Sequence, residues 1–419
     1  MHDVLVIGGG PSGSACAYWL AEAGWDVVVV EKKHFPRDKT CGDGLTPRSV
    51  RQLTDMGLDD VLADHHLFHG LRSLAFGRVL ELGWPEHPGF PSHGFVVTRH
   101  DLDRAVAERA EKAGALVRQR TEAVDLVRDA AGRIGGAVVR DHAAGARSDP
   151  AEIRARVTVV ADGANSRIGR ALGTSRDRDR PQGMAIRGYY TSPRHAEPWI
   201  ESHLDVRDAE GNVLPGYGWI FPVGDGRVNV GVGLLSTFSH WRDVNTSRLM
   251  DAFVAGAPES WGIRPETACG LPTGGRLPMA LSVGPRSGPG WLAAGDAVGA
   301  INPFNGEGIA YAYETGRLAA LCLADALGAG GAAPDLDRAG ADYEQRLLAS
   351  YGLYYKVAEA FVRIIGKPRL MRLMVGTGMH SRTLMEWVLR IMSNMLRPDE
   401  LGPAEAAYRA VAAMISLAA

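Results

Sequence analysis

Cysteine is scarce in this 419-residue chain, which contains four: Cys16, Cys41, Cys269 and Cys322. They lie far apart, without the spacing of a metal site or the density of a disulfide framework, which favours a reducing, cytoplasmic setting. An excess of charge of one sign is also missing, because 46 basic residues are balanced by 48 acidic ones. Without a net positive field, the chain is not expected to bind nucleic acid.

Long hydrophobic runs are absent as well. No stretch reaches the ~18 apolar residues that a membrane-spanning helix needs. The apolar run that begins at Val4 leaves no room before it for the basic and apolar segments of a secretion signal. We therefore expect neither a membrane span nor an export signal. Glycine, in contrast, is plentiful, and its 52 residues gather at a few places, as is typical where the backbone closely approaches a ligand.

The first of these places is an N-terminal strand–helix–strand pattern. The apolar run Val4–Ile7 is followed by a glycine-rich turn, a helical pattern closed by Gly24, and a second apolar run, Val27–Val30, that ends at Glu31. The turn contains Gly8, Gly10 and Gly13, in the spacing of the dinucleotide-binding fingerprint. We expect the helix N-terminus to bind phosphates and Glu31 to accept hydrogen bonds from ribose hydroxyls.

A second element favours FAD over NAD as the dinucleotide. Gly295 and Asp296 follow the apolar strand Trp291–Ala294, and Asp296 would bind the ribityl chain of FAD. Residues Asn302–Gly308 then begin a long helix, which we expect to run from about Gly306 to Leu327. The positive end of its dipole suits the anionic edge of a reduced flavin.

The remaining patterns predict an α/β chain, α+β overall. Apolar strand 156–161 would join the N-terminal strands in one sheet, while β-branched and aromatic runs in residues 181–275 predict an antiparallel sheet. We expect a discontinuous FAD-binding domain at 1–70, 94–180 and 276–330, and an antiparallel-sheet substrate domain at 71–93 and 181–275. A Gly/Ala/Pro-rich linker at 328–334 would lead into a C-terminal helical region at 331–419.

Over nearly its whole length the sequence resembles the geranylgeranyl reductase family of flavoproteins, in the wider p-hydroxybenzoate hydroxylase-like fold group. The resemblance rests on the fingerprint, on Phe35–Leu45, on the ends of two strands at Ala161–Gly163 and Gly295–Asp296, and on Pro303–Gly308. More specific is the family signature YxWxFP, which stands here at Tyr217, Trp219, Phe221 and Pro222, followed by an eight-residue spacer and by Gly231 and Gly233. Segments 41–48, 213–233 and 302–320 are most similar to actinobacterial menaquinone reductases.

The resemblance implies a Rossmann-like FAD-binding domain of the p-hydroxybenzoate hydroxylase type. The expected FAD-binding residues are Gly8, Gly10, Pro11, Ser12, Gly13, Glu31, Lys32, Cys41, Gly42, Asp43, Gly44, Arg99, Ala123, Asp162, Gly163, Gly295, Asp296, Pro303, Gly306, Glu307, Gly308 and Ile309.

The residues Tyr217, Trp219 and Phe221 alternate, so on a strand they share one face and would form an aromatic wall that holds an apolar substrate against the flavin. The alternative is that they form the core face of the sheet. We expect Tyr217, Trp219 and Cys41 to be the catalytic residues, with Tyr217 and Cys41 as candidate proton donors. Cys41 could also be a packed cysteine without chemistry.

Two further patterns have simpler explanations. His65, His66 and His69 have the spacing of neighbours on a helix, but no carboxylate-rich partner segment supports a metal site, and we expect none. The C-terminal region interleaves apolar residues with arginines. Core packing explains most of it, and the rest would suit a lipid tail entering from the inner face of a membrane.

The combined prediction is an FAD-dependent oxidoreductase that reduces isolated C=C bonds of a polyprenyl lipid, in particular the menaquinone side chain. The main alternative is a flavin monooxygenase that epoxidises or hydroxylates a terpenoid, and a lesser one is a non-catalytic lipid carrier with structural FAD. A halogenase would need tryptophan at Tyr217 and isoleucine at Phe221. Since no second fingerprint for a nicotinamide cofactor is present, the electrons would come from an external donor: NADPH, a ferredoxin or a partner reductase.

Overall fold

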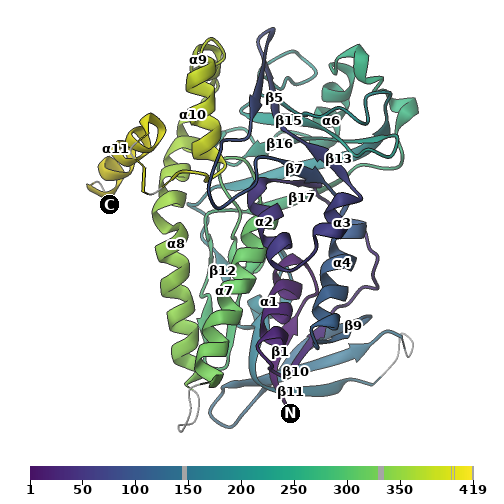
Figure 1. Cartoon of the computed structure of the whole chain (residues 1–419), viewed down its shortest axis with the longest axis vertical. Coiled ribbons are helices and arrows are strands. Elements are labelled where there is room, and N and C mark those ends of the chain that lie inside the picture. Colours follow the sequence, from purple (N-terminus) through teal and green to yellow (C-terminus); the bar gives the residue numbers. More distant parts are fainter. Residues whose placement is uncertain (144–148, 329–334, 398, 401, 418–419) are drawn as a thin grey trace.

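The structure is a computed structural model that describes residues 1–143, 149–328, 335–397, 399–400 and 402–417. Figure 1 shows an elongated molecule with one large sheet near the N-terminus, a second at the opposite end, and helices along one side. Most of the expected linker, residues 329–334, lies outside the described residues.

The first sheet has eight strands, five of them parallel. Its path runs β19-β20-β11-β1-β2-β8, and the hairpin of β9 and β10 extends from the first half of β11. The bounds are β1 (His2–Ile7), β2 (Val27–Val30), β8 (Leu116–Arg118), β9 (Thr121–Arg128), β10 (Ile134–Asp141), β11 (Ala151–Val160), β19 (Ser287–Gly288) and β20 (Trp291–Ala293). Because β1 and β2 are apolar at every central position, this sheet is buried on both faces, as parallel sheets are.

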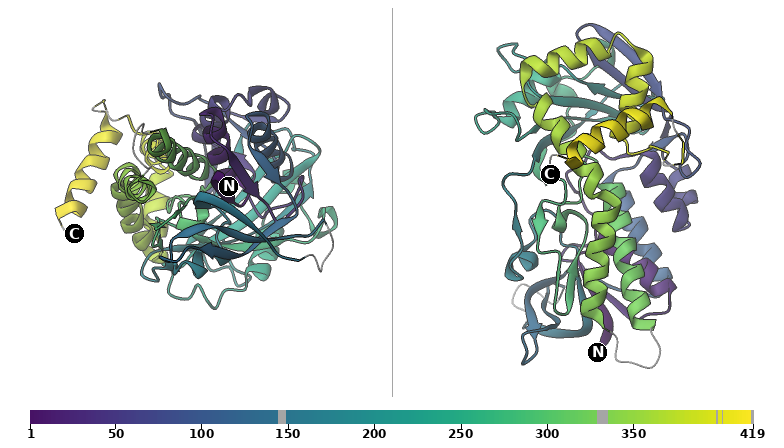
Figure 2. Two further views of the ribbon diagram at one scale, coloured as in Figure 1. Left: turned by 90° about the horizontal axis from the view of Figure 1, so that it is seen from below. Right: turned by 90° about the vertical axis from the view of Figure 1, so that its left-hand side faces the viewer.

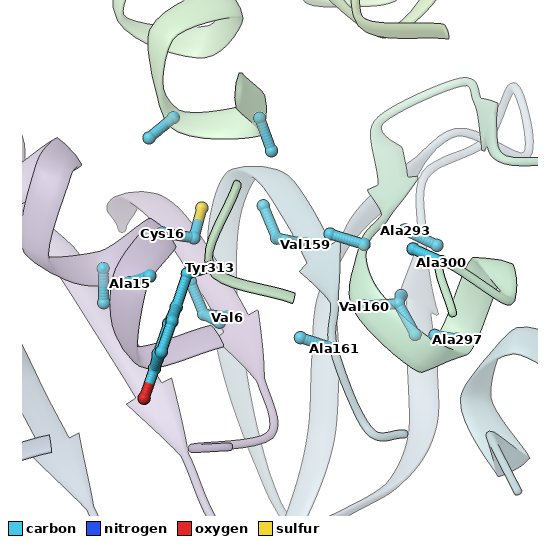
Figure 3. Packing of buried hydrophobic residues seen from close by; sticks show 14 of the residues in the cluster. Val6, Ala15, Cys16, Val159, Val160, Ala161, Ala293, Ala297, Ala300 and Tyr313 are labelled. Atoms are coloured by element: carbon cyan, nitrogen blue, oxygen red, sulfur yellow. The ribbon is translucent and has the colours of Figure 1, made fainter. Parts of the chain in front are cut away.

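Helices cover this sheet, and small residues bring them close to it. Figure 3 shows Val6 of β1 beside Ala15 and Cys16 of α1, with the Tyr313 ring of α7 next to them. The helices packed here are α1 (Pro11–Glu22), α4 (Arg99–Lys112), α7 (Ile309–Gly328) and α8 (Leu336–Ile365). Gly316 of α7 lies so close to α1 that a Cβ on it would come within 2.2 Å of the Ser12 carbonyl oxygen.

The second sheet has seven strands in the order β17-β13-β16-β15-β14-β5-β6. They are β5 (Gly70–Ala75), β6 (Arg78–Gly83), β13 (Gln182–Thr191), β14 (Ile200–His203), β15 (Gly216–Pro222), β16 (Arg227–Leu235) and β17 (Thr273–Pro278). Helix α6 (Thr246–Ala255) packs on one face of it. The sheet is antiparallel except that β5 and β14 are parallel. They lie far apart in sequence, so no hairpin forces them to be antiparallel.

Smaller elements join the two sheets. The strands β3 (Gly44–Leu45), β7 (Gly94–Val96) and β4 (His66–Phe68) form one small sheet, and β12 (Ser175–Arg176) pairs with β18 (Val283–Gly284). Helices α2 (Pro47–Asp55) and α3 (Asp59–Ala63) follow β3, and α5 (Arg167–Ala171) follows β11. The three histidines do not share a helix, because His66 lies on β4, where its Nε2 is 2.7 Å from the Glu197 carbonyl oxygen.

The C-terminal helices follow one another along the side of the molecule. Figure 2 shows α8 passing along both sheets and the last helices gathered at the end that holds the second sheet. These are α9 (Pro368–Gly378), α10 (Arg382–Met392) and α11 (Pro403–Leu417), with α10 packed on β6. No helix among the described residues combines the length and the apolar character that crossing a membrane requires.

One helix start differs from the expectation. Helix α7 begins at Ile309, three residues after the predicted Gly306. Gly306 has a φ of +75°, and this left-handed backbone cannot belong to an α-helix. The segment Asn302–Gly308 is therefore a loop in front of the helix. The pairing of β5 and β6 with strands from residues 181–275 supports the three-part division of the chain, which we retain as a proposal.

Candidate functional site

One continuous cavity of about 1320 Å³ connects the two sheets. Its cofactor end is bordered by the glycine-rich turn at residues 8–12, by Glu31, Asp162 and Asp296, and its middle by residues 41–46 and 303–309. The aromatic wall, formed by Tyr217, Trp219 and Phe221, follows. The apolar end is lined by side chains of the C-terminal helices, among them Phe361, Met371, Met374, Met385, Val388 and Leu389.

The glycine-rich turn packs so tightly against the sheet that no side chain fits at Gly8 or Gly13, while its outer side faces the cavity. A Cβ on Gly13 would lie 1.9 Å from the Gly8 carbonyl oxygen, and one on Gly8 would lie 2.4 Å from the Ala161 carbonyl oxygen. Gly10 caps α1 without a side-chain hydrogen bond, so the first backbone N–H groups of the helix remain available to phosphate. The buried Ser12 hydroxyl has no partner among the described residues. The turn therefore fits a pyrophosphate.

Glu31 is buried at the end of β2 and holds the turn in place. Its Oε2 accepts from the Gly9 N–H at 2.9 Å and its Oε1 from the Lys33 N–H at 2.9 Å. The Arg37 Nε lies 3.7 Å from Oε1, and the Arg37 guanidinium also contacts Asp103, 3.1 Å away. Each carboxylate oxygen can accept another bond, so the ribose hydroxyls of FAD can still bind.

Asp103 also fixes Arg99, which lines the cavity. The Arg99 guanidinium donates to both Asp103 oxygens, at 2.6 and 2.8 Å. The sequence singles out Arg99 but not Asp103. The only sequence signal for Asp103 is its place four residues after Arg99 on one helix.

Two further carboxyl groups border the cofactor end. Burial raises the pKa of Asp296, which follows β20, and that of Asp162, which follows β11. The Asp162 Oδ2 accepts from the N–H groups of Arg167 and Ile168, while its Oδ1 has no partner among the described residues. Both aspartates follow parallel strands, at the edge where ligands bind in open α/β sheets.

The aromatic wall occupies one face of β15. The ring centroids of Tyr217 and Trp219 are 5.8 Å apart, and those of Trp219 and Phe221 are 6.2 Å apart. Glycines make room for these rings: a Cβ on Gly231 would lie 2.2 Å from the Trp219 ring, and one on Gly44 would lie 3.0 Å from the Phe221 ring. This contact explains in physical terms why glycine stands after the spacer of the signature.

Asn229, within that spacer, connects the wall to the loop that contains Cys41. Its Oδ1 accepts from the Trp219 indole N–H at 3.0 Å, and its Nδ2 donates to the Cys41 carbonyl oxygen at 2.9 Å and to Asp43 Oδ2 at 2.8 Å. The Tyr189 hydroxyl also donates to Asp43 Oδ2. Asn229 is fully buried with its polar atoms satisfied. Sequence reasoning missed it, because a spacer position gives no signal of its partners.

The same loop is held from β13 by Arg187, whose guanidinium donates to the carbonyl oxygens of Lys39 and Cys41 at 3.0 and 3.2 Å. Burial raises the pKa of the Cys41 thiol and of the Asp43 carboxyl. Burial likewise raises the pKa of Tyr217 to about 12, and its hydroxyl donates to the Asn305 carbonyl oxygen at 2.6 Å. Cys41 and Tyr217 thus hold their protons firmly at neutral pH.

Nearly all of the expected FAD-binding residues line this cavity. Gly13 and Gly295 do not. They lie behind it, where a Cβ on Gly295 would come within 2.8 Å of the Ser12 side chain. Their role is to let α1 approach the sheet. Within the described residues, no cluster of three or more His, Cys, Asp or Glu side chains could hold a metal ion.

Comparison with known proteins agrees with this geometry. Residues 1–196 match a family model described as "FAD binding domain". The menaquinone reductase of Mycolicibacterium smegmatis is 42% identical, covering 95% of this chain and 93% of that protein. The digeranylgeranylglycerophospholipid reductase of Methanocella arvoryzae is 30% identical, covering 87% and 88%. A geranylgeranyl bacteriochlorophyll reductase-like structure from Thermoplasma acidophilum has a TM-score of 0.74 at 22% identity, covering 99% and 98%.

We expect Glu31→Ala to weaken FAD binding by about 1.5–3 kcal/mol, the usual contribution of hydrogen bonds to a charged group. The change removes the ribose acceptor and also releases the Gly9 and Lys33 N–H groups. Titration of apoprotein with FAD, followed by flavin fluorescence, measures the effect, and Glu31→Gln, which keeps one acceptor oxygen, should lose less. An unchanged affinity, or bound FMN in place of FAD, would refute the role given to Glu31.

Trp219→Ala should leave the flavin absorption spectrum intact and lower turnover of the lipid, because the ring borders the cavity beyond the cofactor end. Trp219→Phe keeps an aromatic ring but leaves the Asn229 oxygen unpaired, which should cost about 1–3 kcal/mol of unfolding free energy. Turnover, flavin spectra and denaturant unfolding of both variants separate the two roles. Undiminished turnover in the alanine variant would remove Trp219 from the substrate site, whereas loss of folding would make it a core residue.

Proposed function

The chain belongs to the geranylgeranyl reductase family of FAD-dependent oxidoreductases, and from that premise we propose that it reduces isolated C=C bonds in the isoprenoid side chain of menaquinone. The observation that carries the proposal is the continuity of the cavity from the FAD-binding turn, past the aromatic wall, to the methionine- and leucine-lined end. A cavity with this order of surfaces suits a long apolar chain. The identity with menaquinone reductases over almost the full length of both chains supports the same substrate.

The residues of the chain bind the two reactants and bring them together. The glycine-rich turn, Glu31 and Asp296 would hold FAD, which supplies hydride chemistry when bound. An isolated double bond has no polar group to which a side chain could hydrogen-bond. Catalysis therefore depends on positioning the isoprenoid chain and excluding water. The aromatic wall and the loop at residues 41–44, held by Asn229 and Arg187, would position the double bond. The positive dipole end of α7 points toward the loop at residues 302–308 and favours a negative charge there.

The reduction and oxygenation alternatives differ in the atoms that the substrate gains. We expect the pre-reduced enzyme, without oxygen, to convert menaquinone into a product heavier by two hydrogen atoms, as measured by mass spectrometry. Free reduced flavin under the same conditions is the control. A product that appears only in air and carries an added oxygen atom would replace the reductase by the monooxygenase, and absence of any turnover with any reductant would favour a lipid carrier.

We further propose that α9 contacts the cytoplasmic face of the membrane, from which the substrate enters the cavity. Leu373 is 65% exposed, and Leu373 and Met374 also line the apolar end. Arg369 and Arg372 border a shallow hollow beside Leu373 on the same helix. This combination of apolar and basic side chains at one end of a lipid cavity is suited to an anionic bilayer.

Membrane contact predicts a specific effect of charge on α9. A basic side chain near an anionic surface contributes about 1 kcal/mol to the free energy of membrane binding. The double variant Arg369→Ala, Arg372→Ala should therefore bind anionic vesicles about 30-fold more weakly. Co-sedimentation with phosphatidylglycerol–phosphatidylcholine vesicles measures it, with pure phosphatidylcholine as reference. Leu373→Glu should also reduce binding, whereas the matched control Leu271→Glu, at a site 91% exposed and outside the cavity lining, should not. Equal binding by all variants would contradict the contact.

A further inference from the structure

The reduction of a double bond needs a proton as well as a hydride. The two proton donors that the sequence suggests, Tyr217 and Cys41, are poor sources of that proton. The Tyr217 hydroxyl donates to a carbonyl oxygen, and the thiol of Cys41 is deeply buried. Burial raises the pKa of each group above the ordinary value for its residue type. A general acid works best when its pKa lies near the operating pH. The acid should therefore be another group that lines the middle of the cavity.

Glu307 occupies such a position. It lies in the loop before α7, two residues after Asn305, whose carbonyl oxygen accepts the Tyr217 hydroxyl. The Thr46 hydroxyl, just after the loop of Cys41, donates to Glu307 Oε1. This contact joins the two loops that border the cavity between its cofactor end and the aromatic wall.

The carboxyl group of Glu307 has few hydrogen-bond partners as an anion, although it lies at the positive end of the α7 dipole. Its Oε2 is buried and has no hydrogen-bond partner among the described residues, and none of those residues forms an ion pair with it. The guanidinium of Arg48, whose charge acts on Glu307, donates to Glu314 at 2.8 Å and to the Asn394 carbonyl oxygen at 2.8 Å. Burial, with the charge of Glu314 added, raises the pKa of Glu307 to about 7, although Thr46, Arg48 and the Asn305 side chain act in the opposite direction.

The charged and titratable groups around Glu307 come from several elements. They are Arg48 of α2, Tyr217 of β15, Tyr311 and Glu314 of α7, and Tyr354 of α8. The uncharged Thr46, at the N-cap of α2, adds its hydroxyl. The tyrosines hold their protons because burial raises the pKa of each of them. Glu307, in contrast to these tyrosines, therefore changes charge near neutral pH.

We propose that Glu307 is the general acid of the reaction, a role that rests on the proposed reductase function. Its O–H bond breaks as the proton forms a C–H bond with one alkene carbon. The other carbon receives hydride, with its electron pair, from the reduced cofactor. The carboxylate left behind is stabilised by the Thr46 hydroxyl and the positive charge of Arg48, and it regains a proton from water before the next turnover.

The test is a single-turnover measurement with pre-reduced enzyme across pH, combined with infrared titration of the purified holoenzyme. In the wild type, product formation should fall about tenfold per pH unit above about 7, because the acid form is the active one. Glu307→Gln should be about 100-fold slower at pH 6, the lower range for general acid catalysis, and independent of pH. A protonated-carboxyl band that titrates near 7 should be missing from that variant.

Two further variants make the test specific. Thr46→Val removes a donor that favours the ionised form, so the alkaline limb should move to higher pH, and because Thr46 makes no capping hydrogen bond to α2 the helix should remain. Glu359→Gln is the matched control, since Glu359 is a buried glutamate with a raised pKa that does not line the cavity. It should keep the wild-type pH profile.

Wild-type rate and pH dependence in Glu307→Gln would overturn the proposal. An unmoved limb in Thr46→Val, or a band near 7 that persists in Glu307→Gln, would do the same. If the wild type itself forms no hydrogenated product, the proposed function fails, and the infrared band alone then decides whether Glu307 is the buried acid.

Discussion

The architecture depends on how closely α1 approaches the first sheet and α7 approaches α1. The Gly13–Gly8 contact allows no side chain, since a Cβ at Gly13 would lie 1.9 Å from the Gly8 carbonyl oxygen, and Gly316 is nearly as restricted against the Ser12 carbonyl oxygen. These approaches place the uncapped N-terminus of α1 at the carboxyl edge of β1, β11 and β20. Glu31, Asp162 and Asp296 follow neighbouring strands of this sheet and reach the same edge. The cofactor end is thus a direct consequence of backbone packing.

This constraint explains which features the sequence could predict. A glycine requirement, an apolar strand and a carboxylate at a strand end are local, so the dinucleotide-binding turn and the FAD cofactor follow from a few consecutive residues. The start of α7 was predicted three residues too early, because Gly306 looks like a helix opening in sequence while its left-handed φ excludes it. The spacing of His65, His66 and His69 alone could not show that His66 lies on a strand, since a three-residue strand has no periodicity that distinguishes it from a helix.

The residues that escaped prediction act across long sequence distances. Asn229 joins Trp219 to a loop 188 residues earlier in the chain, and Arg187 reaches the same loop from β13. Nothing near Asn229 in sequence marks it, because two of its three hydrogen bonds, to Cys41 and Asp43, exist only after the second sheet meets the loop at residues 41–44. Thr46 and Glu307 are likewise 261 positions apart. Tertiary contacts of this kind are fixed by strand order, which pattern reasoning does not supply.

The division of the cavity into polar and apolar parts has an electrostatic consequence. Along the whole cavity, burial raises the pKa of every cavity-lining acid for which a shift is resolved, including Asp43, Asp296, Cys41 and Tyr217. Burial shifts these groups toward their uncharged forms, which lowers the desolvation cost of binding an uncharged isoprenoid chain and strengthens the interactions of the charges that remain. An acid with a pKa near neutrality can function there because Thr46, Arg48 and Asn305, which favour its ionised form, offset part of the effect of burial. The same low polarity that accepts the lipid therefore sets the acidity of the group that can protonate it.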